Sequence, residues 1–138
     1  MKKVFLRLYH ISKDIISDVM IPHIPESDFE DQETPRICFA SSIQGCLIGA
    51  YENKDLTNKI FHVYSIITDD YYIPKLNEVA DQHVTGEVWI KYPVKPKYLY
   101  DIKITGIKKY ELQKINNEFF KIPQYEYEVL CKKLNKTI

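Results

Sequence analysis

The sequence is poor in the residues that several common kinds of site require. Its four glycines argue against a glycine-rich phosphate loop, and its three cysteines, without CxxC spacing, argue against a disulfide framework or a zinc ribbon. The four histidines show neither an i,i+4 pair nor HExxH spacing, so we expect no metal site. No apolar run approaches a membrane span and no signal-peptide h-region is present, which predicts a cytoplasmic protein without membrane contact.

What the chain does contain is enough to build an ordinary core. Hydrophobic residues make up 45% of its 138 residues and aromatic residues 13%, a composition that disfavours disorder. Eleven tyrosines and six phenylalanines favour β-sheet over a helical bundle. The length and the absence of a linker or a repeat predict a single domain over residues 1–138.

Charge is distributed unevenly along the chain although the net charge is zero. Residues 1–90 hold 8 Lys and Arg against 14 Asp and Glu, whereas residues 91–138 hold 11 lysines against 5 acids and no arginine. The lysines can be ordinary solvated side chains, or they can form a surface for an acidic partner or a phosphate backbone. The lack of arginine disfavours bidentate recognition of phosphates or bases.

Hydrophobic periodicity and turn residues predict alternating strands and short helices. We expect strands at residues 3–10, 37–40, 60–68, 86–93 and 98–106. We expect helices at 14–22, from about 43 to 53, and at 74–83. Ser41 or Ser42 would cap the N-terminus of the helix that begins near residue 43. The acidic stretch 24–36 is typical of a surface loop, and its part 27–33 is expected to be mobile and dispensable for folding. The tail at 110–136 fits a strand or a helix.

Three segments, in order, carry a resemblance to a known family. The first is Leu8-Tyr9-His10-Ile11-Ser12. The second runs from Arg36-Ile37-Cys38-Phe39-Ala40 through a predicted helix with small residues to Tyr51. The third is Gly86-Glu87-Val88-Trp89-Ile90, followed by Tyr98-Leu99-Tyr100-Asp101-Ile102-Lys103-Ile104. Together, over about residues 4–106, they resemble the ADP-ribosyltransferase superfamily, in which these blocks surround NAD.

The resemblance implies a role for each segment. His10 and Ser12 would hold the ribose and nicotinamide ends of NAD, and Tyr51 would stack on the nicotinamide ring. Cys38 stands where the family has an aromatic residue, and Tyr51 lies about two residues later than the family pattern, so Phe39 or Tyr64 is an alternative platform. Glu87 would stabilise the positive charge that develops as the nicotinamide–ribose bond breaks.

The fold that the resemblance implies is an α+β, ADP-ribosyltransferase-like fold with split, mainly antiparallel β-sheets and a few short helices. The implied function is that of a transferase of ADP-ribose, or an NAD glycohydrolase, which uses NAD as substrate and a protein or nucleic acid as acceptor. Two alternatives stay open. One is a non-catalytic interaction or inhibitor module on the same scaffold, with the loop 27–33 and the basic tail as contact surfaces. The other is a single-stranded nucleic-acid binder.

Overall fold

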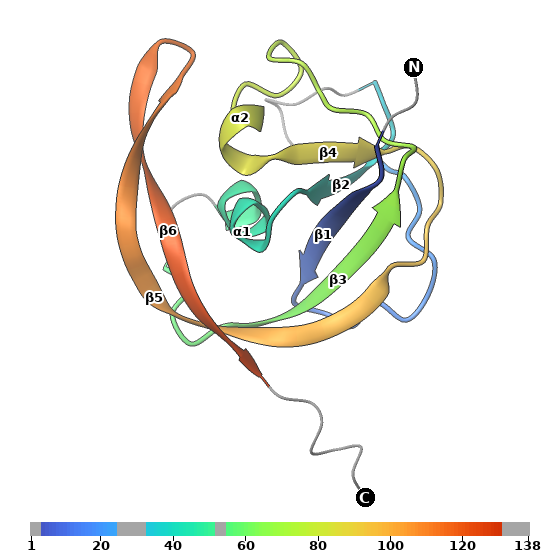
Figure 1. The fold of residues 1–138 in the computed structure, drawn as a ribbon, viewed down its shortest axis with the longest axis horizontal. Helices are drawn as coiled ribbons and strands as arrows, with labels where there is room; N and C mark the ends of the chain where they lie inside the picture. The colour runs from blue at the N-terminus through green and yellow to red at the C-terminus, as the bar shows by residue number, and fades with distance from the viewer. Residues whose placement is uncertain (1–3, 25–32, 52–54, 131–138) are drawn as a thin grey trace, which may run out of the picture.

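The computed structural model describes residues 4–24, 33–51 and 55–130, and Figure 1 shows how their helices and strands are arranged. The elements in chain order are β1 (Leu6–Ser12), β2 (Ile37–Ala40), α1 (Ile43–Tyr51), β3 (Ile60–Thr68), α2 (Gln82–Thr85), β4 (Glu87–Ile90), β5 (Lys97–Ile115) and β6 (Glu118–Leu130). The strands expected at 37–40 and 60–68 are confirmed with the same bounds.

In the described part of the chain the strands form one six-stranded sheet, in the order β4-β2-β1-β3-β5-β6. Every neighbouring pair is antiparallel, which confirms the predicted mainly antiparallel architecture with few helices. The expected division into split sheets is not found among these strands, because each strand is hydrogen-bonded to the next from β4 to β6. The junction between β1 and β2 is nevertheless narrow: it has the single pair Tyr9–Ala40, whereas β1 pairs with β3 along its whole length.

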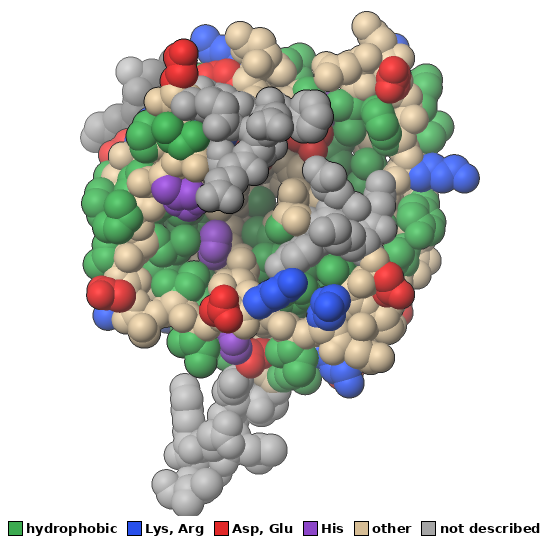
Figure 2. Space-filling view, turned by 180° about the vertical axis from the view of Figure 1, so that it is seen from behind, with side chains coloured by type: hydrophobic (Ala, Val, Ile, Leu, Met, Phe, Trp, Pro, Cys, Tyr) green, Lys and Arg blue, Asp and Glu red, His purple; other side chains and the backbone are tan. Residues whose placement is uncertain are grey.

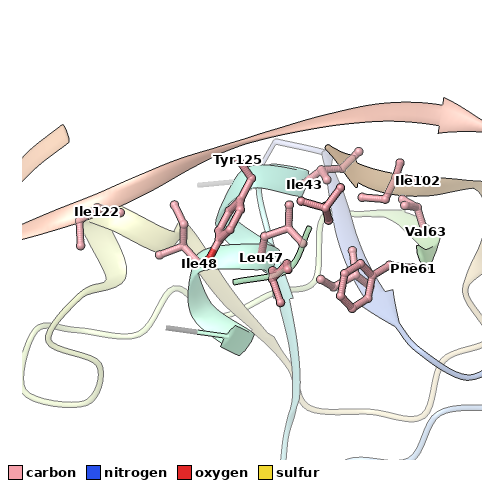
Figure 3. Packing of buried hydrophobic residues seen from close by; sticks show 11 residues of the cluster. Ile43, Leu47, Ile48, Phe61, Val63, Ile102, Ile122 and Tyr125 are labelled. Atoms are coloured by element: carbon pink, nitrogen blue, oxygen red, sulfur yellow. The ribbon is translucent and has the colours of Figure 1, made fainter. Parts of the chain in front are cut away.

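Apolar side chains build a core on each face of the sheet, because alternate residues of a strand point to opposite faces. On one face, α1 packs against the strands. Figure 3 shows Ile43 and Leu47 of α1 together with Phe61, Val63 and Ile102 from β3 and β5. The other face carries a second cluster, formed by Leu8, Ile37, Phe39, Ile66, Tyr71, Val88 and Ile90.

The helix α1 begins where the sequence predicted a cap. The Ser42 hydroxyl accepts a hydrogen bond of 2.9 Å from the Gly45 backbone N–H, and the Ser42 carbonyl accepts the first helical bond from Cys46. Ser42, rather than Ser41, is therefore the N-cap. The helix continues to Tyr51 and packs on the concave side of the sheet, where the long ribbon of β5 and β6 curves past it (Figure 1).

Two predicted helices are wrong in place or length. Residues 14–22 form no helix, because their backbone groups bond to other parts of the chain: the Ile16 N–H donates to the Tyr64 hydroxyl at 2.7 Å, and Met20 pairs with Val94. The helix expected at 74–83 reduces to turns, and α2 starts only at Gln82. Apolar periodicity alone did not reveal these tertiary backbone contacts.

The tail that the sequence left open is a long β-ribbon. Strand β5 continues well beyond the predicted residue 106 and pairs with β6 from Asp101–Leu130 to Ile115–Glu118. Asn116 and Asn117 connect the two strands with φ angles of 52° and 67°. Two successive left-handed residues are typical of a type I′ hairpin turn, and asparagine is among the few residues that tolerate this conformation. The predicted loop 27–33 lies outside the described residues, except for Glu33.

Candidate functional site

The first two segments that carried the resemblance, and the Gly86–Ile90 part of the third, lie on or next to the neighbouring strands β1, β2 and β4 around one cavity, whereas Tyr98–Ile104 lies on β5 away from it. The cavity has a volume of about 230 Å³ and lies beside the narrow β1–β2 junction. Its walls come from the ends of β1 and β2, from small residues of α1, and from the turn that leads into β4. The lining residues are His10, Ile11, Cys38, Phe39, Ala40, Gly45, Cys46, Gly49, Ala50, Thr85 and Glu87.

The imidazole of His10 spans β1 and β2 next to their single paired position. Its Nδ1 lies 3.1 Å from the Cys38 carbonyl oxygen. A carbonyl oxygen only accepts, so Nδ1 carries the proton and donates it, and Nε2 of the neutral ring is left as an acceptor. Burial lowers the pKa of His10, although the bond to Cys38 opposes that shift. His10, which lines the cavity, is therefore a neutral ring whose Nε2 can accept a hydrogen bond.

The carboxylate of Glu87 is held by groups on two strands. Trp89, two residues further along β4, donates its indole N–H to Glu87 Oε2 at 2.6 Å, and Trp89 itself is fully buried. The Cys38 thiol on β2 lies 3.6 Å from the same oxygen as a weak donor. The Glu87 backbone N–H also donates to the Thr85 hydroxyl at 3.1 Å. These contacts fix the direction of the carboxylate at the cavity wall.

Close packing of α1 against the segment before β4 shapes the cavity. A Cβ added at Gly45 would lie 1.8 Å from the Thr85 carbonyl oxygen, so only glycine allows the helix to approach this closely. Gly86 has a φ of 69°, a left-handed conformation that also favours glycine, and it directly precedes Glu87. These glycines place Glu87 beside α1.

The other predicted site residues differ in where they lie. Ser12 does not line the cavity: its hydroxyl accepts from the Asp14 backbone N–H at 3.0 Å. Phe39 does line it, but only 2% of Phe39 is exposed and its ring packs 5.6 Å from the His10 ring, so it presents little surface for stacking. Tyr51 ends α1, and its side chain is outside the described part of the structure. Tyr64 is buried away from the cavity.

Sequence reasoning missed two residues of the site: Trp89, which bonds to the Glu87 carboxylate, and Arg36, which packs on the Trp89 ring. The Arg36 guanidinium carbon is 4.2 Å from the centroid of the Trp89 ring, and both side chains are fully buried. The spacing of Glu87 and Trp89 was a usable signal, because residues i and i+2 of a strand share a face. The position of Arg36 carried no such signal, since it depends on how β2 pairs with β4.

Among the residues that the structure describes, a metal site, a reactive thiol and a membrane span have less support than the cavity. No group of three His, Cys, Asp or Glu side chains there could hold a metal ion. Burial raises the pKa of the Cys46 thiol to about 12, which makes it a poor nucleophile. No helix in the described ranges is both long and apolar enough to cross a membrane.

Comparisons with protein-family models, with curated proteins and with solved structures find no match to this chain.

Proposed function

We propose that the cavity binds the nicotinamide riboside end of NAD in an ADP-ribosyltransferase-like fold. The supporting observation is that His10 and Glu87, 77 positions apart in the printed sequence, line the same cavity. A volume of about 230 Å³ is smaller than the pockets of about 300–1,000 Å³ that enclose drug-sized ligands. The cavity thus takes one end of the dinucleotide, and the adenylate end lies outside it.

In this proposal each group at the cavity has a chemical task. His10 Nε2 accepts a hydrogen bond from a ribose hydroxyl without adding a charge. The Glu87 carboxylate lies beside the ribose C1′, where positive charge develops as the bond to nicotinamide breaks. Nicotinamide leaves as a neutral molecule. An acceptor O–H or N–H group, or water, then forms the new bond to C1′ and releases its proton to solvent.

The test is release of nicotinamide from NAD by the wild-type chain and by Glu87→Gln, which keeps the size of the side chain but removes its charge. We expect the rate to fall by about 10²–10³, the usual effect of removing one electrostatic stabiliser. Glu118→Gln, an exposed carboxylate at the far end of the ribbon, is the matched control and should leave the rate unchanged.

NMR titration with NAD separates binding from catalysis. We expect resonances of His10 and its neighbours to shift in both the wild type and Glu87→Gln. Equal rates for these two proteins would remove Glu87 from the mechanism. Shifts without any release, across protein and nucleic-acid acceptors, would favour the non-catalytic interaction module. No shift at millimolar NAD would overturn the proposed binding.

A further inference from the structure

The far part of the β5–β6 ribbon extends past the rest of the sheet and presents one exposed face. Residues Tyr110, Leu112 and Lys114 of β5 lie on this face with Phe119 and Lys121 of β6, because Leu112 pairs with Lys121 and Lys114 with Phe119. The exposed fractions are 56% for Tyr110, 64% for Leu112 and 65% for Phe119. We call these five residues the outer ribbon face.

The charge of the outer ribbon face has one sign. Both of its charged residues are lysines, and Lys114 Nζ lies 5.9 Å from the centre of the Phe119 ring. The nearby carboxylates are on the opposite face, since Glu111 pairs with Ile122 and Glu118 with Ile115. Glu111 is also engaged by Lys109 at 3.4 Å. An anionic partner would therefore meet cations without meeting carboxylates on this face.

Three cross-strand pairs lie on this face: Leu112–Lys121 and Lys114–Phe119 each join an apolar side chain to a lysine, and Tyr110 pairs with Pro123. Tyr110 and Phe119 lie about four residues apart along the ribbon, or about 13 Å, with Lys121 between them. Single-stranded nucleic acid combines these features, because its bases stack on aromatic rings while its phosphates attract cations. On a helix or surface that inserts into a membrane interface the cations lie on a separate face from the apolar side chains, whereas here Lys114 and Lys121 alternate with them. Figure 2 shows hydrophobic side chains and a cationic side chain together at the right of the view, where the ribbon lies.

We propose that the outer ribbon face binds single-stranded nucleic acid with little sequence preference. Lysines act as point charges on phosphates, and the face has no arginine for bidentate recognition of bases. Binding here stands apart from the chemistry of the cavity. That the bound strand is also the acceptor of ADP-ribose rests on the proposed function.

The test is fluorescence anisotropy with labelled 12-nucleotide dT and rU oligomers at several salt concentrations. We expect Tyr110→Thr and Phe119→Thr each to weaken binding at least about fivefold, since each removes one stacking platform. The double variant Lys114→Gln/Lys121→Gln should reduce the slope of log association constant against log salt concentration by about 1.4 in magnitude. The control pair, Lys59→Gln with Lys75→Gln, removes the same charge from other exposed sites and should change neither quantity by as much.

The outcomes separate this proposal from the proposed function. Glu87→Gln should bind the oligomers as the wild type does, and the ribbon variants should keep the NAD-induced shifts at His10. No binding of either oligomer, or an equal loss in the control pair, would overturn the proposal. Ribbon-dependent binding to vesicles of phosphatidylcholine and phosphatidylserine without oligomer binding would also overturn it, and would assign the face to a membrane surface.

Discussion

Trp89 donates its indole N–H to Oε2 of Glu87 at 2.6 Å, across two residues of the short strand β4. Trp89 is fully buried, and Arg36 stacks on its ring, so the donor has a fixed position. A carboxylate at a cavity wall is thereby oriented by a group that does not itself line the cavity. The direction of the Glu87 side chain therefore depends also on the pairing of β2 with β4, which places Cys38 opposite Trp89.

We expect Trp89→Phe to lower the free energy of unfolding by about 1.5–3 kcal/mol, because it removes a hydrogen bond to a charged group. Phenylalanine keeps an aromatic ring beneath Arg36. Urea denaturation measures the change. In a double-mutant cycle with Glu87→Met, Trp89→Phe should cost clearly less than it does in the wild type. Additive effects would show that the bond contributes nothing to stability.

The lowered pKa of His10 predicts that the free energy of unfolding depends on pH. Burial lowers the pKa of His10 below its usual value of 6.5 in the folded chain. As the pH falls through 6.5, the unfolded chain therefore binds this proton before the folded chain does. The stability that the neutral ring provides is complete above this pH and decreases progressively below it.

NMR titration of the His10 ring should give a midpoint below 6.5. The free energy of unfolding of the wild type, relative to His10→Asn, should decrease between pH 7.5 and pH 5.5, because asparagine cannot titrate there. Asparagine still offers an N–H to the Cys38 carbonyl, so the variant is expected to fold. A midpoint above 6.5, or parallel stability curves for the two proteins, would contradict this account of His10.

The sequence predicted those parts of the fold in which local pattern and tertiary structure agree. The apolar runs at 37–40 and 60–68 are strands because most of their residues are buried and most are β-branched or aromatic. The cap at Ser42 is a local hydrogen bond, so the sequence could reveal it. Residues 14–22 have a helical pattern, but the pairing of Met20 with Val94 determines their conformation. That contact joins segments more than 70 residues apart, and no local pattern reports it.

Only part of the candidate site was predictable from the sequence. His10 and Glu87 were identified from the resemblance, and the structure brings both to one cavity. The resemblance gave Ser12 a place at the site, yet its hydroxyl bonds to the turn after β1. The ribbon was not predicted, because the tail at 110–136 fits a strand or a helix by pattern and Asn116–Asn117 was not identified as a hairpin turn.

The Asn116–Asn117 turn should respond to substitution according to its backbone angles. Asn117 has a φ of 67°, a conformation that costs most residues about 1–2 kcal/mol but costs glycine little. We expect Asn117→Gly to be neutral or stabilising by up to about 1 kcal/mol, and Asn117→Val to be destabilising by about 1–2 kcal/mol. Urea unfolding of both variants decides the matter. Equal stability of the two would mean that the turn does not hold a left-handed residue here.

Two glycines of α1 provide a matched pair for testing how the cavity is built. A Cβ at Gly45 would lie 1.8 Å from the Thr85 carbonyl oxygen, which is backbone and cannot rotate away, whereas a Cβ at Gly49 would make ordinary contacts of 3.6 Å and more. Alanine is favoured over glycine in a helix by about 1 kcal/mol. Gly49→Ala should therefore be neutral or stabilising, while Gly45→Ala should destabilise the chain even though its helix propensity improves equally.

The measurement for this pair is the free energy of unfolding together with NMR shifts around the cavity. We expect Gly45→Ala to lower stability by about 1–3 kcal/mol, the usual cost of overpacking, and to shift resonances of Thr85 and Glu87. Gly49→Ala, one turn further along the same helix, should leave Glu87 in place. If both variants were stabilised alike, the close approach of α1 to Thr85 would be wrong, and so would the packing that forms the cavity wall next to Glu87.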